Sequence, residues 1–230
     1  MSPTIEVLDD PRAACADLLV EAAAAGGQLV LTGGSTPQAA YERAAEKREA
    51  WSEATLWWGD ERCVPPDDER SNYLMAKRAL LDRVVAEGGG PAVHRIPGEL
   101  GPTQGADAYE AELREVGPPE FDLLLLGLGP DGHIASMFPD QRSLSEDSRL
   151  VVGVEEAGLE PYVPRVTFTF PALALGKRVV VLVAGEEKAD AVAAAFGESA
   201  KPDPHVPSSL LASVAGDLVV LLDSAAASGL

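Results

Sequence analysis

The chain has 230 residues, of which 46% are hydrophobic and 24% are charged, the composition of an ordinary globular protein. Its 18 basic and 37 acidic residues give a net charge of −19, which repels nucleic acid and anionic membranes at long range. No apolar run approaches the ~20 residues needed to span a bilayer, and the N-terminus lacks a basic region followed by an apolar one. We therefore expect a cytoplasmic protein without nucleic-acid or membrane partners.

The length suits one large α/β domain, and no linker, repeat or low-complexity segment interrupts the sequence. We expect a single domain over residues 1–230, as a monomer or a small homo-oligomer. The two cysteines, Cys15 and Cys63, form no C-x-x-C pair, and we expect both to be reduced thiols.

The first elements are a helix over residues 11–25, ended by two glycines, and a short strand over 28–32. The turn Gly33-Gly34-Ser35-Thr36-Pro37 follows and opens an Ala-rich helix, with Ser or Thr expected at its cap and Pro at or near its first position. Such a turn offers free N–H groups and a hydroxyl to a phosphate. A plain tight turn with a capping serine fits the same residues, and both interpretations stay open.

A strand over residues 54–58 ends in a charged loop over 59–73, and Ser71 or Asn72 is expected to cap a helix that runs to about Ala86. A glycine run over 88–90 closes that helix. The loop fits a solvated surface segment. Its length and the arginines Arg62 and Arg70, at the carboxyl edge of the expected sheet, favour a functional loop.

The second half of the chain continues to alternate strands and helices, which indicates a parallel sheet covered by helices. The run 165–170 alternates apolar and polar residues and predicts a strand with one buried face. The tail from Ser224 is expected to fray. The further expected elements are strands over 93–96, 121–126, 150–154, 178–184 and 218–222, and helices over 103–116, 171–175 and from Gly185 onward.

The apolar strand expected over 121–126 is followed by a turn that carries Asp131 and His133. Ligands of open α/β sheets bind outside the carboxyl ends of the strands, so this pair lies where chemistry is expected. Histidine can take a proton from water at neutral pH, and a neighbouring carboxylate can orient it. The pair is sufficient to hydrolyse an activated ester without a covalent intermediate. The alternative is a capping aspartate and a turn histidine without a catalytic role.

The same turn has the spacing G-x-G-x-x-G, which after a strand can indicate a dinucleotide-binding turn. Pro130 removes a backbone N–H that such a turn would donate, and His133 replaces the usual small residue. The sequence contains no G-x-S-x-G elbow, so a serine nucleophile is not expected. Its three histidines form no H-E-x-x-H motif and no Cys/His cluster with metal-ligand spacing, so a metal is not expected either. Lys188, in the first turn of the helix after Gly185, opposes the helix dipole, which favours a bound anion over a solvated surface lysine.

Six motifs stand in order along the chain: LTGGSTP (31–37), WWGDER (57–62), ERSNY (69–73), GLGPDGHIASMFP (127–139), PRVTFT (164–169) and GEEK (185–188). Taken together, these motifs resemble the 6-phosphogluconolactonase family, which shares its fold with glucosamine-6-phosphate deaminases. The resemblance covers residues 31 to 188 and implies a single-domain modified doubly wound, Rossmann-like α/β fold, with a mostly parallel sheet and helices on both faces. It implies hydrolysis of 6-phosphoglucono-δ-lactone in the pentose phosphate pathway, with a phosphorylated sugar lactone as substrate and no cofactor.

The resemblance also assigns roles to residues. It implies that His133 is catalytic with Asp131 beside it, that Lys188 binds the phosphate, and that the arginines contact a substrate anion or the oxyanion. The substrate-binding set that it implies is Gly33, Gly34, Ser35, Asp60, Arg62, Arg70, Asn72, Gly132, Arg165 and Lys188.

Two alternatives remain beside the lactonase. One is a sugar-phosphate isomerase or deaminase, but those enzymes carry a Phe-Asn-Glu-Pro type of segment after the histidine, whose glutamate helps to open the sugar ring. This chain has Ser136-Met137-Phe138-Pro139 instead. The other is a non-catalytic sugar-phosphate-binding regulator, against which the presence of both Asp131 and His133 counts.

Overall fold

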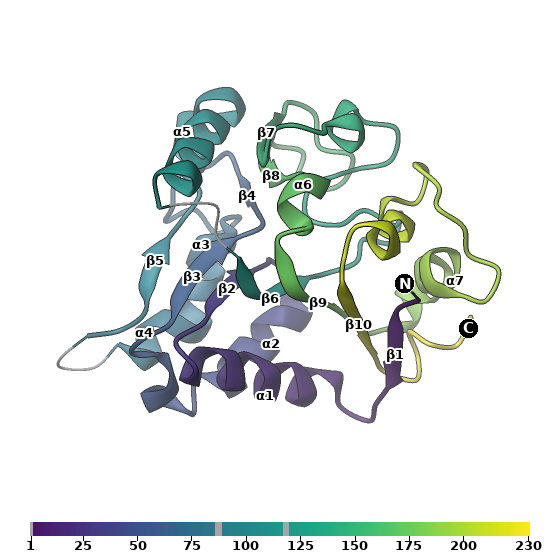
Figure 1. Ribbon diagram of the computed structural model, residues 1–230, viewed down its shortest axis with the longest axis horizontal. Coiled ribbons are helices and arrows are strands. Elements are labelled where there is room, and N and C mark those ends of the chain that lie inside the picture. Colours follow the sequence, from purple (N-terminus) through teal and green to yellow (C-terminus); the bar gives the residue numbers. More distant parts are fainter. Residues whose placement is uncertain (1, 86–88, 117–119) are drawn as a thin grey trace.

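The structure, a computed structural model, describes residues 2–85, 89–116 and 120–230. Its main sheet has seven strands, and every neighbouring pair is parallel (Figure 1). In spatial order these strands are β1 (Thr4–Val7), β10 (Asp217–Leu222), β9 (Gly176–Val183), β6 (Phe121–Leu126), β2 (Gln28–Leu31), β3 (Thr55–Trp58) and β5 (Ala92–His94).

The strand order reverses between β2 and β6. From β2 the chain builds outward through β3 to β5, and it then returns to the other side of β2 and builds through β6, β9 and β10. Such a reversal opens a crevice at the carboxyl ends of the two central strands, where open α/β sheets bind their ligands. The prediction of a mostly parallel, doubly wound sheet is confirmed.

A second, antiparallel sheet stands above the carboxyl edge of the first. It consists of β4 (Asp60–Arg62), β8 (Arg165–Phe168) and β7 (Val151–Val154), with β8 in the middle. Residues 60–62 were expected in a loop, because three charged residues carry no strand pattern of their own. They form a strand because β8, about a hundred residues later, pairs with them.

Helices cover both faces of the main sheet, as predicted. In Figure 1, α1, α2 and α4 lie on one side, whereas α5, α6 and the second sheet lie on the other. The bounds of the helices are α1 (Pro11–Ala24), α2 (Ser35–Ala44), α3 (Asn72–Ala76), α4 (Asp82–Val84), α5 (Pro102–Glu115), α6 (Phe170–Leu173) and α7 (Ala189–Phe196).

The helix expected after the charged loop begins at Asn72, and the Ser71 side chain accepts a hydrogen bond from the Leu74 amide, as a cap should. A π-helical stretch, Lys77–Leu81, separates α3 from α4. The expected end of this helix near Ala86 and the first of the closing glycines, Gly88, lie outside the described residues.

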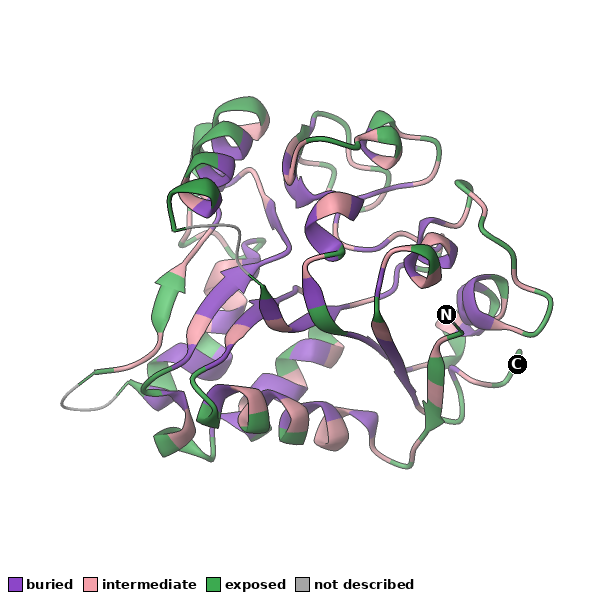
Figure 2. Cartoon of the chain, viewed as in Figure 1, coloured by how far each residue is buried: buried purple, intermediate pink, exposed green. Residues whose placement is uncertain are grey.

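Figure 2 shows the buried residues concentrated in the central strands and on the inward sides of the helices. Aromatic rings join the two sheets: Phe168 of β8 lies 5.6 Å from the ring of Phe121 in β6 and 6.1 Å from Tyr109 in α5. Trp57 of β3 packs against both Phe121 and Tyr109. Such pairs contribute ~0.5–1.5 kcal/mol each beyond the area that they bury, so they hold β8 firmly against the main sheet.

Three further expectations differ from the structure. The edge strand β1 was not predicted, because most of its side chains are exposed and give no burial pattern. The strand over 165–170 was expected to bury one face, but all four residues of β8 are buried, since it is the central strand of a covered sheet. The tail from Ser224 forms turns instead of fraying, because Asp223 accepts hydrogen bonds from the amides of Gly185 and Ala226.

No helix in the described part of the chain has the length and apolar character to cross a membrane.

Candidate active site

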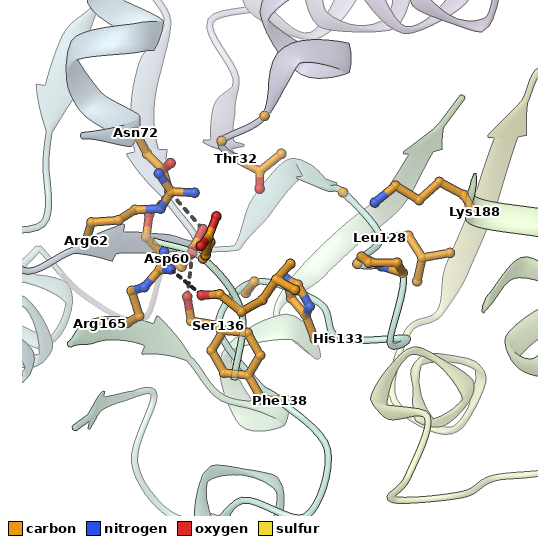
Figure 3. Close-up of a pocket in the computed structure, with 18 residues that line it drawn as sticks. Thr32, Asp60, Arg62, Asn72, Leu128, His133, Ser136, Phe138, Arg165 and Lys188 are labelled. Atoms are coloured by element: carbon orange, nitrogen blue, oxygen red, sulfur yellow. Dashed lines mark hydrogen bonds between the residues drawn. The ribbon is translucent and has the colours of Figure 1, made fainter. Parts of the chain in front are cut away.

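A cavity of about 190 Å³ lies at the reversal of the strand order (Figure 3). The loops after β2, β3, β6 and β9 contribute to it, together with β4, β8 and the segment before β8. Its lining residues are Thr32, Gly33, Gly34, Asp60, Arg62, Asn72, Gly127, Leu128, Gly129, Pro130, His133, Ala135, Ser136, Phe138, Leu159, Glu160, Arg165 and Lys188.

The cavity brings together most of the predicted site residues from five separate parts of the sequence. Gly132 and Asp131 do not line it but adjoin the His133 ring or its backbone. Ser35 and Arg70 also fall outside the lining residues. The predicted residues that line the cavity are Gly33, Gly34, Asp60, Arg62, Asn72, His133, Arg165 and Lys188.

His133 is held by Asp131. Its ring Nδ1 lies 2.6 Å from Asp131 Oδ1, and the same oxygen accepts a hydrogen bond from the His133 amide at 3.2 Å. Burial raises the pKa of Asp131, but the hydrogen bond and the charge of His133 outweigh burial and leave the pKa lowered. Because Nδ1 is engaged, Nε2 is the ring nitrogen that remains for a molecule in the cavity. The Phe138 ring, 4.6 Å away, packs against the imidazole.

The glycine spacing of this turn has a structural cause. A Cβ atom on Gly129 would lie 2.0 Å from His133 Nδ1, so only glycine lets the imidazole fold back over the turn. Gly132 has φ +82°, a conformation that favours glycine, and its carbonyl accepts a hydrogen bond from the Ser208 amide. The second and third glycines of G-x-G-x-x-G therefore serve the Asp131–His133 pair and require no dinucleotide.

Asp60 joins three loops at the floor of the cavity. Its side chain, in a residue only 5% exposed, accepts hydrogen bonds from Ser136 Oγ at 2.6 Å and from Asn72 Nδ2 at 3.1 Å. Asn72 in turn packs against the turn after β2, where a Cβ on Gly33 would lie 2.0 Å from its Oδ1. The network fixes the loops after β2, β3 and β6 relative to one another.

Glu61 was not predicted as a site residue, although it lies inside the WWGDER motif. Its carboxylate accepts hydrogen bonds from the amides of Asn72 and Tyr73, the first residues of α3, and from the Ser71 hydroxyl. Burial raises its pKa although these bonds act to lower it. Glu61 therefore anchors the start of α3 and thereby places Asn72.

Lys188 is the cation on one side of the cavity. It ends the 3₁₀ turn Glu186–Lys188 and immediately precedes α7 instead of lying in its first turn. Burial lowers its pKa, while the charges of Glu187 and Asp131 act in the opposite direction. Its ammonium group has no hydrogen bond or ion pair within the described ranges, so it is free to meet a substrate anion.

Arginines occupy the opposite side: in Figure 3, Arg62 and Arg165 face Lys188 across the cavity, with His133 between them. Arg62 of β4 and Arg165 of β8 are direct cross-strand partners, and like charges placed so are destabilising unless compensated. Arg165 is compensated by carbonyls of the segment before β8. Arg62 donates from Nη1 to the Arg70 carbonyl, but its buried Nε has no partner in the described part of the chain.

Arg70 points elsewhere. Its guanidinium forms a two-pronged contact with Asp68, at 2.8 and 2.7 Å, so its contribution to the cavity is the backbone carbonyl that holds Arg62. The predicted phosphate turn differs in one detail: Gly34, not Ser35, caps α2, and Ser35 is an exposed first helical residue.

Several lining residues were not predicted, notably Thr32, Ser136, Phe138, Leu159 and Glu160. The first three lie inside the quoted motifs, so the motifs could have drawn attention to them. Leu159 and Glu160 lie in a segment without any pattern, and only the folded chain brings them to the cavity. Among the described residues, no cluster of three or more His, Cys, Asp or Glu side chains could hold a metal ion.

Comparison with known proteins identifies the family. The sequence model of the family described as glucosamine-6-phosphate isomerases/6-phosphogluconolactonase matches residues 7–220 of this chain. The 6-phosphogluconolactonase of Nostoc sp. is 38% identical over 98% of both chains, and that of Mycobacterium tuberculosis is 40% identical over 86% of this chain and 87% of its own. The crystal structure of 6-phosphogluconolactonase from Leishmania guyanensis superposes with a TM-score of 0.85 at 31% identity, covering 100% of this chain and 99% of that one. The chain belongs to the glucosamine-6-phosphate isomerase/6-phosphogluconolactonase family.

Proposed function

We propose that this protein hydrolyses 6-phospho-D-glucono-1,5-lactone to 6-phospho-D-gluconate, a step of the oxidative pentose phosphate pathway. The observation that carries the proposal is the Asp131–His133 pair in a cavity whose opposite sides present Lys188 and Arg62. The relatives named 6-phosphogluconolactonase, which align over most of the chain, support the same reaction.

The proposed reaction starts with a water molecule hydrogen-bonded to His133 Nε2. The imidazole takes one proton as the water oxygen attacks the lactone carbonyl carbon, and Asp131 stabilises the imidazolium that forms. The carbonyl oxygen becomes an oxyanion. When the tetrahedral intermediate collapses, the bond to the ring oxygen breaks, and the imidazolium returns its proton to that oxygen. The products are the open-chain acid and the resting histidine.

Cations and backbone dipoles supply the remaining binding energy. We propose that Lys188 binds the phosphate together with the turn Gly33-Gly34-Ser35, because a helix N-terminus and an ammonium group favour the same dianion. Arg62, whose Nη1 donates to the Arg70 carbonyl while its Nη2 makes no hydrogen bond in the described part of the chain, is the arginine available to the substrate carbonyl or another anionic oxygen. Asp60, Asn72 and Gly132 shape the floor and the catalytic turn. No metal or organic cofactor takes part in this scheme.

The deaminase reaction is supported less well. The position that would need a carboxylate after the histidine falls in Ser136-Met137-Phe138-Pro139. In this structure the Ser136 hydroxyl donates to Asp60 and so serves the loop network.

We further propose that residues 1–230 act as one domain, as a monomer or small homo-oligomer in the cytoplasm, without binding nucleic acid. The unpaired thiols Cys15 and Cys63 suit a reducing compartment.

The test adds the phosphorylated lactone at neutral pH and follows acid release above the spontaneous rate. Turnover that is lost in His133→Ala supports the lactonase. Ammonia release from glucosamine 6-phosphate would instead identify a deaminase. Tight binding of 6-phosphogluconate without turnover of either substrate would identify a regulator.

A further inference from the structure

Arg165 is almost entirely withdrawn from solvent, at 3% exposure, and two of its three guanidinium nitrogens donate to backbone carbonyls. Nε donates to the Val163 carbonyl at 3.0 Å, and Nη2 donates to those of Pro161 at 2.7 Å and Leu159 at 3.3 Å. All three acceptors belong to one short stretch, residues 158–163, which we call the wall segment. A planar fork of donors can gather several carbonyls at once, which an ammonium group on a flexible stem cannot do.

The wall segment forms one side of the cavity and supports the catalytic histidine indirectly. Leu159 and Glu160 line the cavity. Gly158 packs so closely on Phe138 that a Cβ would lie 3.0 Å from the phenyl ring, and Phe138 itself packs on His133. Contacts therefore run without a gap from Arg165 through the wall segment to the imidazole.

The two arginines of the cavity differ in what their donors do. Arg62 keeps an unpartnered, buried Nε, whereas Arg165 has committed Nε and Nη2 to the wall segment. A substrate anion that drew Arg165 away would leave three part-buried carbonyls without their charged donor, and losing charge-assisted hydrogen bonds is costly. Arg62 has only Nη1 committed, to the Arg70 carbonyl, so it can meet the same anion with Nη2 without breaking a hydrogen bond.

From these contacts we propose that Arg165 is a positioning residue: it acts by holding the wall segment 158–163 against Phe138 and the cavity, and it is not the residue that binds the phosphate. The kinetic part of this inference rests on the proposed lactonase function.

The test uses Arg165→Lys, which keeps the positive charge but loses the fork. The Michaelis constant should rise roughly ten-fold, the scale of one lost charge-assisted hydrogen bond, and by a similar factor for 6-phosphogluconolactone and for unphosphorylated gluconolactone. Without any substrate, amide hydrogen exchange in a peptide covering 155–164 should accelerate at least ten-fold. Arg178→Lys, an exposed arginine paired with Asp217 near the start of β9, is the matched control and should change neither measurement.

Three results would overturn the proposal: a loss confined to the phosphorylated lactone, unchanged exchange in 155–164 despite lost activity, or wild-type values in both measurements. The exchange measurement needs no turnover. If only the lactonase function is wrong, the wild-type protein will not hydrolyse the lactone, but Arg165→Lys will still exchange its amides in 155–164 faster than the wild type. If Arg165→Lys does not fold, Gly158→Ala tests the same segment, because its methyl group displaces the segment from Phe138. It should raise both Michaelis constants about equally, and a change in only one or in neither would contradict the role assigned to the wall segment.

Discussion

His133 offers the cavity only Nε2, because Nδ1 is engaged by Asp131 at 2.6 Å. The imidazole is proposed to act on water and not to hold the sugar. His133→Ala should therefore lower kcat by ~10²-fold or more and leave the Michaelis constant nearly unchanged. Asp131→Asn should have a smaller effect, since orientation and charge stabilisation are lost but the base remains. Steady-state kinetics on variants with a native circular dichroism spectrum decide the matter, and near-normal turnover in folded His133→Ala would refute the assignment.

Lys188 lacks a partner in the described part of the chain and faces the cavity. Losing a charge-assisted contact to phosphate costs ~1.5–3 kcal/mol, or roughly ten- to a hundred-fold in affinity. Lys188→Ala should raise the Michaelis constant for the phosphorylated lactone by that factor and hardly change the weak reaction with unphosphorylated gluconolactone. Lys177→Ala, an exposed lysine paired with Asp122, is the matched control. Equal damage to both lactones would mean that Lys188 acts on the ring or on the fold.

Burial lowers the pKa of Lys188 from its ordinary value of 10.5. The charged form binds the anion and predominates below the pKa, so affinity falls as pH rises toward it. Because the pKa is lowered, this loss should begin at a lower pH than for an ordinary lysine. Calorimetric titration with 6-phosphogluconate between about pH 7 and 10 should show the decline, and Lys188→Arg should remove it, since arginine stays charged throughout. Identical alkaline profiles for the two proteins would exclude Lys188 as the titrating group.

Among the elements of the fold, the hydrogen bond between Ser136 and Asp60 ties the turn after β6 to β4. Ser136→Ala leaves one oxygen of a buried carboxylate without that donor, which should lower the free energy of unfolding by ~1–3 kcal/mol. Urea denaturation measures the change. Ser145→Ala, which removes an exposed serine's bond to the Arg142 carbonyl, should stay within about 0.5 kcal/mol of wild type. A similar small effect in both variants would show that the Asp60 link carries little stability.

The central strands β2 and β6 were predictable, because their apolar runs and bounding glycines are local signals. The strand β4 was not, since its partner β8 lies about a hundred residues away and its own residues are polar. The site shows the same division. Motifs predicted His133 and Lys188 as site residues, and both line the cavity. The three carbonyls that bind Arg165 lie in a segment that carries no pattern. The sequence therefore predicts charged groups that gather at the cavity, but their partners depend on long-range packing.

At the scale of the whole molecule, the proposed chemistry depends on the chain's own side chains, and the described residues contain no metal-ligating cluster. Activity should therefore survive dialysis against EDTA unchanged. The measurement compares initial rates before and after chelation and after adding back Mg²⁺ or Zn²⁺. Loss on chelation that a divalent ion restores would reveal a metal dependence that the proposed scheme lacks.

The reversal of strand order between β2 and β6 also governs when the protein can become active during folding. Leu29 pairs with Leu123 across this junction, so the side of the cavity that holds Asp60 and the side that holds His133 meet only after a large loop has closed. Closing such loops is slow compared with forming local helices. In a refolding experiment, enzyme activity should therefore return later than the helical circular dichroism signal. The delay between the two measures how long the sheet takes to close.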